Sequence, residues 1–160
     1  MQRKALIAVT LLAGIGTARA IDTPVMKEGL WKLHTINTGA GQKPYEATYF
    51  LCRDHAYDLK AKALADQIMK SCTNISDTTS GSNRYINMTC KVSTSTLVSK
   101  GVITSKGDTY YHSETTTTFT PPLSGESQTT MIQEQTWVSA CPAGMSPGDR
   151  KMADGSIQKH

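Results

Sequence analysis

The residues in this chain most clearly suited to a chemical role are its four cysteines, Cys52, Cys72, Cys90 and Cys141. No C-x-x-C pair occurs in the sequence, so a dithiol redox centre is not indicated. The short C-x₂₋₄-C spacings of zinc sites are absent from the sequence as well. Structural disulfides are therefore the favoured interpretation, and four cysteines allow three pairings.

The turn sequence SGSN indicates which pairing forms. If a hairpin folds about Gly81, then Cys72 and Cys90 lie directly opposite each other, because they are equally distant from the turn. Opposed residues of antiparallel strands can come within disulfide distance. Elimination leaves a Cys52–Cys141 bridge, which would pin the last strand and leave the segment after it as a solvated tail.

Histidines and carboxylates give a second candidate site. In TYYHSETTTTF, side chains alternate along a strand, so Tyr110, His112 and Glu114 share one face. This group could bind a metal or a polar ligand, but a solvent-facing polar ladder is the favoured interpretation. The sequence contains no H-E-x-x-H, G-x-S-x-G or phosphate-loop motif. We therefore expect no enzyme activity, no metal and no cofactor.

The first twenty residues are typical of a secretory signal peptide. Two basic residues, Arg3 and Lys4, precede an apolar run over 5–15, and Ala18 and Ala20 form an A-x-A cleavage site. The apolar run is too short to span a bilayer. We therefore expect a soluble, exported protein in the periplasm or outside the cell, where disulfides can form.

Removal of this segment also changes the charge. Three of the 17 basic residues leave with it, so 14 remain against 13 acidic residues. No basic stripe is left, and nucleic acid is not an expected partner. The predicted organisation is a signal peptide over 1–20, one β-rich domain over 21–141 and a C-terminal tail over 142–160.

Hydrophobic residues alternate with period two in most of the chain, which predicts strands. They are expected near 29–37, 44–52, 72–79, 84–92, 95–104, 108–119 and 128–139. One segment, 54–70, instead predicts a helix, with Asp54 as its N-cap. Its apolar stripe is Tyr57, Ala61, Leu64 and Ile68. The predicted fold is mainly β: an antiparallel meander forming a curved sheet or small barrel, with one helix and stabilising disulfides.

Several short segments, taken in order, are similar to a known family. They are MKEGLWKLHT, FLC before the helix, the Cys72 and Cys90 pair around a turn, the Thr-rich strands and the closing CPAGMSPGD…ADG. The chain resembles the small exported bacterial proteins grouped as domain of unknown function 3617. The resemblance implies a Gram-negative periplasmic or outer-envelope protein, and it implies no reaction or catalytic residue.

Two functions fit these features. The first is a non-enzymatic domain that binds a small apolar molecule or lipid in the curve of its sheet. The residues expected to line the site are Tyr49, Leu51, Ile86, Met88 and Trp137. The alternative is an interaction or structural module of the cell envelope or an extracellular assembly, whose strand edges accept an envelope protein.

Overall fold

The computed structural model describes residues 25–39 and 43–160, so the predicted signal peptide lies outside the described residues. All seven predicted strands and the predicted helix are present, and two short strands follow them. The elements are β1 (Gly29–Gly39), β2 (Tyr45–Arg53), α1 (His55–Met69), β3 (Cys72–Ser80), β4 (Asn83–Val92), β5 (Ser95–Lys106), β6 (Tyr110–Leu123), β7 (Glu126–Ser139), β8 (Arg150–Met152) and β9 (Ile157–Gln158).

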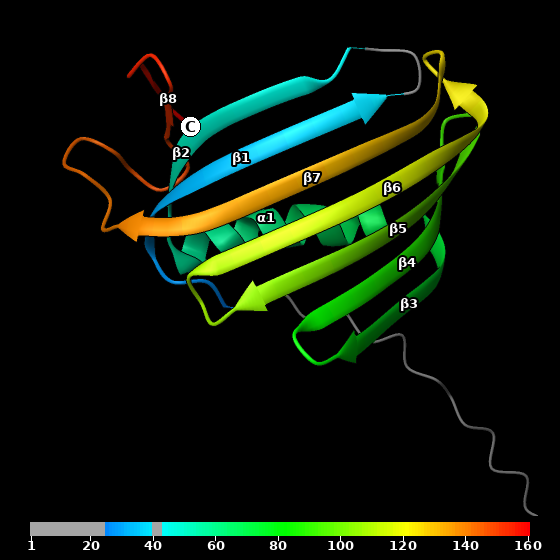
Figure 1. Ribbon diagram of the computed structural model, residues 1–160, viewed down its shortest axis with the longest axis horizontal. Coiled ribbons are helices and arrows are strands. Elements are labelled where there is room, and N and C mark those ends of the chain that lie inside the picture. Colours follow the sequence, from blue (N-terminus) through cyan, green and yellow to red (C-terminus); the bar gives the residue numbers. More distant parts are fainter. Residues whose placement is uncertain (1–24, 40–42) are drawn as a thin grey trace, which may run out of the picture.

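These strands form one antiparallel sheet, in the order β3-β4-β5-β6-β7-β1-β2-β8-β9. Strands β3 to β7 follow one another as a meander, and β1 lies between β7 and β2. Figure 1 shows the sheet curving, with α1 on one side of it. The predicted curved antiparallel sheet with one helix is confirmed. Among the described residues the sheet stays open, with β3 and β9 at its edges.

The hairpin of β3 and β4 places Cys72 opposite Cys90, as predicted, but its register differs from the predicted one. Next to the turn, Ser80 pairs with Asn83, so the hairpin is not centred on Gly81. A bulge between Thr73 and Ser76 then shifts the register by one residue. The extra residue in β3 restores the Cys72–Cys90 alignment, and the two residues form a disulfide.

The main hydrophobic cluster lies on the helix-facing side of β1 and β2. Trp31 is fully buried, packs with Met26, Leu33 and Leu51, and donates its indole N–H to the Lys27 carbonyl at 2.8 Å. Four half-buried aromatic residues border this cluster: Tyr49, Tyr57, Tyr111 and Trp137. The core is small, and much of the helix-facing side of the sheet lies beyond it.

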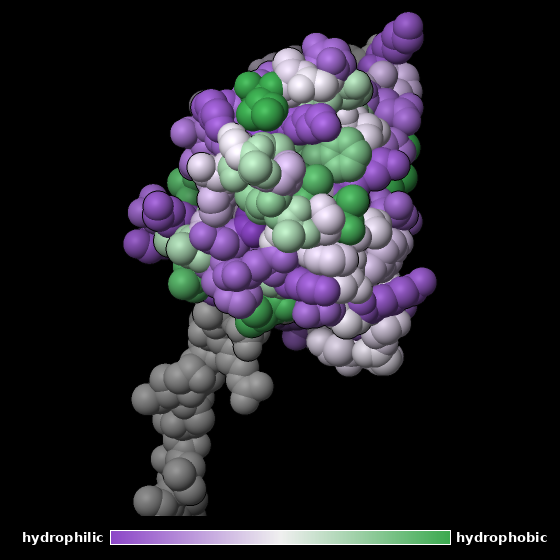
Figure 2. Space-filling model, turned by 90° about the vertical axis from the view of Figure 1, so that its left-hand side faces the viewer, coloured by the Kyte–Doolittle hydropathy of each residue, from purple (hydrophilic) through white to green (hydrophobic). Residues whose placement is uncertain are grey.

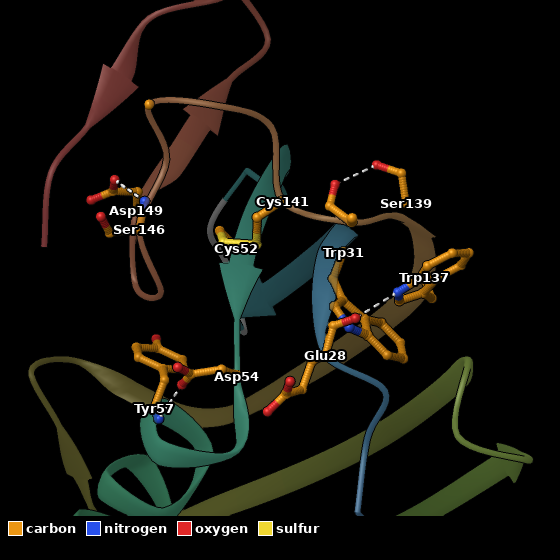
Figure 3. Close-up of a disulfide and its surroundings, with 12 residues drawn as sticks. Glu28, Trp31, Cys52, Asp54, Tyr57, Trp137, Ser139, Cys141, Ser146 and Asp149 are labelled. Atoms are coloured by element: carbon orange, nitrogen blue, oxygen red, sulfur yellow. Dashed lines mark hydrogen bonds between the residues drawn. A yellow bond between two sulfur atoms is a disulfide. The ribbon is translucent and has the colours of Figure 1, made fainter.

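A second cluster on the opposite face surrounds the Cys52–Cys141 disulfide, the pairing predicted by elimination. Cys52 is fully buried and packs with Leu30 and Met145. Its backbone is also held, because its N–H donates to the Asp149 carbonyl at 3.0 Å and its carbonyl accepts from Gly148 at 2.8 Å. The bridge therefore joins the end of β2 to the segment that follows β7 (Figure 3).

Residues 142–160 do not form the solvated tail that the sequence suggested. Strand β8 pairs with the β2 edge, and β9 pairs with β8. Asp149 is 2% exposed, and its carboxylate accepts from Ser146 N at 2.7 Å, Lys159 Nζ at 2.8 Å and His160 N at 3.2 Å. The buried carboxylate of Asp149 thus connects Ser146 with Lys159 and His160. The sequence did not reveal this, because Ser146, Lys159 and His160 lie near Asp149 in the chain but follow no periodic pattern.

We expect Asp149→Asn to destabilise the protein in a pH-dependent way. The hydrogen bond from Lys159, followed by that from Ser146, lowers the pKa of Asp149 from 3.8 to about 2. The folded pKa lies below the unfolded one, so the stabilisation is complete above about pH 4 and disappears as the pH falls through about 2. Urea unfolding of both proteins from pH 7 to pH 2 measures this. Parallel stability curves for the two proteins would contradict the assignment.

Both disulfides should stabilise the fold, and the longer loop should matter more. The loops close over sequence separations of 18 and 89 residues. In the chain-entropy model the Cys72–Cys90 bridge adds about 3 kcal/mol to the free energy of unfolding, and the Cys52–Cys141 bridge adds about 4–5 kcal/mol. Thermal unfolding of C72S/C90S and C52S/C141S, each against the oxidised wild type, compares them. Peptide mapping that found free thiols in natively purified protein would rule the bridges out.

Candidate functional site

Helix α1 lies across one side of the sheet without packing tightly onto it. Asp54 caps it as predicted, accepting from Tyr57 N at 2.7 Å, but none of the helix residues is buried. The predicted apolar stripe is therefore wrong as a packing face, since Leu64 and Ile68 are each 61% exposed. Tyr57 alone of that stripe reaches the core, where it also meets the His160 ring edge-on at 5.6 Å. The second half of the stripe, Leu64 and Ile68, therefore faces solvent and not the sheet.

A cavity of about 590 Å³ lies between α1 and the sheet. Its size is within the range of about 300–1,000 Å³ typical of small-molecule sites. The helix contributes residues at three- and four-residue steps, and the sheet contributes its floor. The lining residues are Val25, Met26, Arg53, His55, Asp58, Leu59, Ala61, Lys62, Ala65, Asp66, Met69, Tyr111 and Gln135. Apolar atoms make up most of the exposed lining, so this space is suited to an apolar molecule.

Apolar side chains also reach the surface beside this cavity. Val25 and Leu59 line it and are 73% and 67% exposed. Figure 2 views the end of the molecule where β2 ends and α1 begins, and hydrophobic atoms gather in the middle of that face within a hydrophilic border. Part of the apolar lining of the cavity is therefore accessible from solvent.

The cavity also contains an ordered polar network, centred on Arg53. The guanidinium donates from Nε to Asp58 Oδ1 at 2.9 Å and from Nη1 to Gln135 Oε1 at 3.0 Å. Gln135 Nε2 donates to Gln133 Oε1 at 2.8 Å, and Gln133 Nε2 donates to Thr35 Oγ1 at 3.4 Å. The chain of amides runs across β7 to β1 and holds the guanidinium in place.

Tyr111 adds a neutral hydroxyl to the same floor. Burial raises the pKa of this phenol above its usual value of 10.0. The group therefore stays protonated at neutral pH and can donate or accept a hydrogen bond without adding charge.

The five residues predicted to line a ligand site all lie on the helix-facing side of the sheet, to judge from the strand register. The structure brings three of them, Tyr49, Leu51 and Trp137, together around Trp31 in the core. Ile86 and Met88 are farther along the sheet, on β4. The described lining of the cavity includes none of the five predicted residues, Tyr49, Leu51, Ile86, Met88 and Trp137.

The cavity floor is lined by Arg53, Tyr111 and Gln135, which were not predicted as site residues from the sequence. A usable signal existed for two of them. Tyr111 and Gln135 fall on the inward positions of their strands and are paired directly across β6 and β7. Arg53 gave no such signal, because it ends a strand and its direction depends on where the helix lies.

The outer face of the sheet carries the predicted histidine–glutamate group. His112 Nε2 lies 3.1 Å from Glu114 Oε1, and the Tyr110 hydroxyl donates to Glu134 Oε2 at 3.2 Å. On β1, His34 lies opposite Glu134 in the register. The arrangement is a surface ladder of polar pairs. Within the described ranges, no group of three or more His, Cys, Asp or Glu side chains is placed to hold a metal ion.

None of the helices in the described part of the chain is long and apolar enough to cross a membrane.

Comparison with known proteins identifies a family for this chain. Residues 26–141 match the family model described as "Protein of unknown function (DUF3617)". Neither the curated proteins nor the solved structures contain a match to the chain.

The loose packing of α1 can be tested with a matched pair of truncations. Leu33 is 4% exposed in the core, whereas Leu64 is 61% exposed on the helix. We expect Leu33→Ala to cost about 2–5 kcal/mol of unfolding free energy. Leu64→Ala should cost less than about 0.5 kcal/mol, since a surface change leaves no cavity. Denaturant unfolding measures both, and equal losses would show that the helix is packed.

Proposed function

Since the chain belongs to the family described as "Protein of unknown function (DUF3617)", a description that names no activity, we propose a function from the cavity itself. The protein is a binding domain for a small apolar molecule or lipid, held between α1 and the curved sheet. The observation that carries this proposal is the cavity of about 590 Å³, lined mostly by apolar atoms, under a helix with no buried residue.

The physical argument rests on the cost of leaving such a space open. Leu59, Ala65 and Met69 line the cavity from the helix side, and Met26 lines it from the chain before β1. Water against these groups is unfavourable by about 25 cal/mol for each Å² of apolar surface. A bound apolar molecule removes this cost, whereas a helix meant only to complete the core would sit directly on the sheet.

The protein acts as a carrier or receptor and not as a catalyst. The charged groups of the cavity are paired with each other, as in Arg53 with Asp58 and Lys62 with Asp66. This arrangement supports binding and does not resemble an acid, base and nucleophile set. The proposed location is the periplasm of a Gram-negative bacterium or the extracellular space. The signal-like start of the sequence and the two disulfides support an oxidising compartment.

The alternative is an interaction module of the envelope or of an extracellular assembly. It is favoured by β3, which forms one edge of the sheet and whose residues after Cys72 are all exposed. An exposed edge can accept a strand from an envelope protein. The bulge in β3 interrupts this edge, and for that reason we place the cavity first.

Filling the cavity should abolish binding. Ala65 and Ala63 are both exposed residues of α1, but only Ala65 is among the lining residues of the cavity. We expect Ala65→Trp to lose most of the fluorescence enhancement of N-phenyl-1-naphthylamine, because the indole occupies the apolar space. Ala63→Trp adds the same side chain outside the cavity and should bind like the wild type.

Native mass spectrometry of protein purified without detergent complements the dye assay. An extra mass on the wild type that is absent from Ala65→Trp supports the proposal. Equal dye binding by both tryptophan variants would contradict it, and a bare wild-type monomer that binds no dye would favour the interaction module.

A further inference from the structure

The shape of the cavity restricts the molecule that it could hold. Its helical lining runs from His55 to Met69. At 1.5 Å per residue this wall is about 21 Å long. A site of this length and modest volume is narrow, and a single extended hydrocarbon chain fills it better than a compact ring system does.

Charge is distributed unevenly along this length. Arg53 and Asp58 are largely buried, with side chains 16% and 23% exposed. The other charged lining residues are more open: Lys62, Asp66 and His55 have side chains 32%, 51% and 54% exposed. The far end of the helical wall is Met69, which is uncharged. The cavity thus has one deep charged position, close to the start of α1.

The two members of the deep ion pair are not equally fixed. Arg53 is held from the sheet, by Gln135 at 3.0 Å and by the Trp31 ring, whose centroid lies 5.4 Å from its guanidinium carbon. Asp58 belongs to α1, which has no buried residue. The guanidinium is therefore the fixed partner, and an incoming anion could replace Asp58 while the Asp54 cap continues to hold the start of α1.

Resting on the proposed function, we infer that the ligand is a single-chain amphiphile with an anionic head group. Its carboxylate or phosphate binds Arg53, where the planar guanidinium can donate two parallel hydrogen bonds. Its hydrocarbon chain follows the inner face of α1 towards Met69. Asp58 occupies the head-group position in the free protein and turns towards solvent when the ligand binds.

Four probes with the same sixteen-carbon chain test this inference: palmitate, monohexadecyl phosphate, hexadecan-1-ol and hexadecyltrimethylammonium. Displacement of N-phenyl-1-naphthylamine, below the micellar concentration of each probe, gives the affinities. The wild type should bind the two anions most tightly. Arg53→Met should weaken both anions by about tenfold or more, the size expected for lost charge-assisted hydrogen bonds, and leave hexadecan-1-ol unchanged.

Asp58→Asn supplies an opposite and independent change. It removes the competing carboxylate but keeps the side-chain shape, so both anions should bind more tightly and hexadecan-1-ol should not change. This variant keeps the inference testable if Arg53→Met fails to fold, which circular dichroism would reveal.

The results separate the two proposals. Equal affinity of the wild type for anionic, neutral and cationic chains would overturn the anionic head group while leaving apolar binding intact. Tighter binding of the cation, or no response of the anions to Asp58→Asn, would overturn it too. If the wild type binds the dye but none of the four probes displaces it, the inference fails and the proposed function stands. If the wild type does not bind the dye either, the proposed function itself fails.

Discussion

The structure depends above all on the junction around Cys52. This residue is fully buried at the end of β2, and its disulfide to Cys141 fixes the segment that follows β7. Its backbone is hydrogen-bonded to Gly148 and Asp149, so the hairpin formed by β8 and β9 is attached at the same point. Helix α1 begins three residues later, at His55. This junction therefore sets the start of the helix, the path of the chain after β7 and the position of β8 and β9 (Figure 3).

This anchoring explains how a helix with no buried residue stays in place. At one end α1 is held by its Asp54 cap and by the Arg53–Asp58 ion pair. At the other end the chain continues into β3, which the Cys72–Cys90 bridge fastens to β4. Between these ends the helix does not need to pack on the sheet. The space beneath it remains open, and the proposed binding site follows from that geometry.

The side chains on the two faces of the sheet differ in a way that is consistent with this arrangement. The outer face carries exposed ladders such as His112 with Glu114. The inner face combines an aromatic cluster around Trp31 with an amide chain that ends at Arg53. An apolar space with one oriented cation differs from a dry core, which would exclude the charge.

Much of the fold could be predicted from the sequence because its signals are local. Period-two alternation placed the strands, and the Asp54 cap placed the start of the helix. The distances of Cys72 and Cys90 from a turn indicated their pairing, although a bulge proved necessary for it. Family membership followed from short segments in a given order.

The features decided by tertiary structure depend on contacts that follow no periodic pattern in the sequence. The apolar stripe through Leu64 and Ile68 predicted a buried helix face, but both side chains are 61% exposed on a helix with no buried residue. Asp149 gathers Ser146, Lys159 and His160, which share no periodic pattern. The sequence by itself therefore determined the strands, the helix and the disulfide pairing. Only the folded chain decided where α1 stands and that Arg53 faces a cavity, because both depend on contacts that close across the whole sheet.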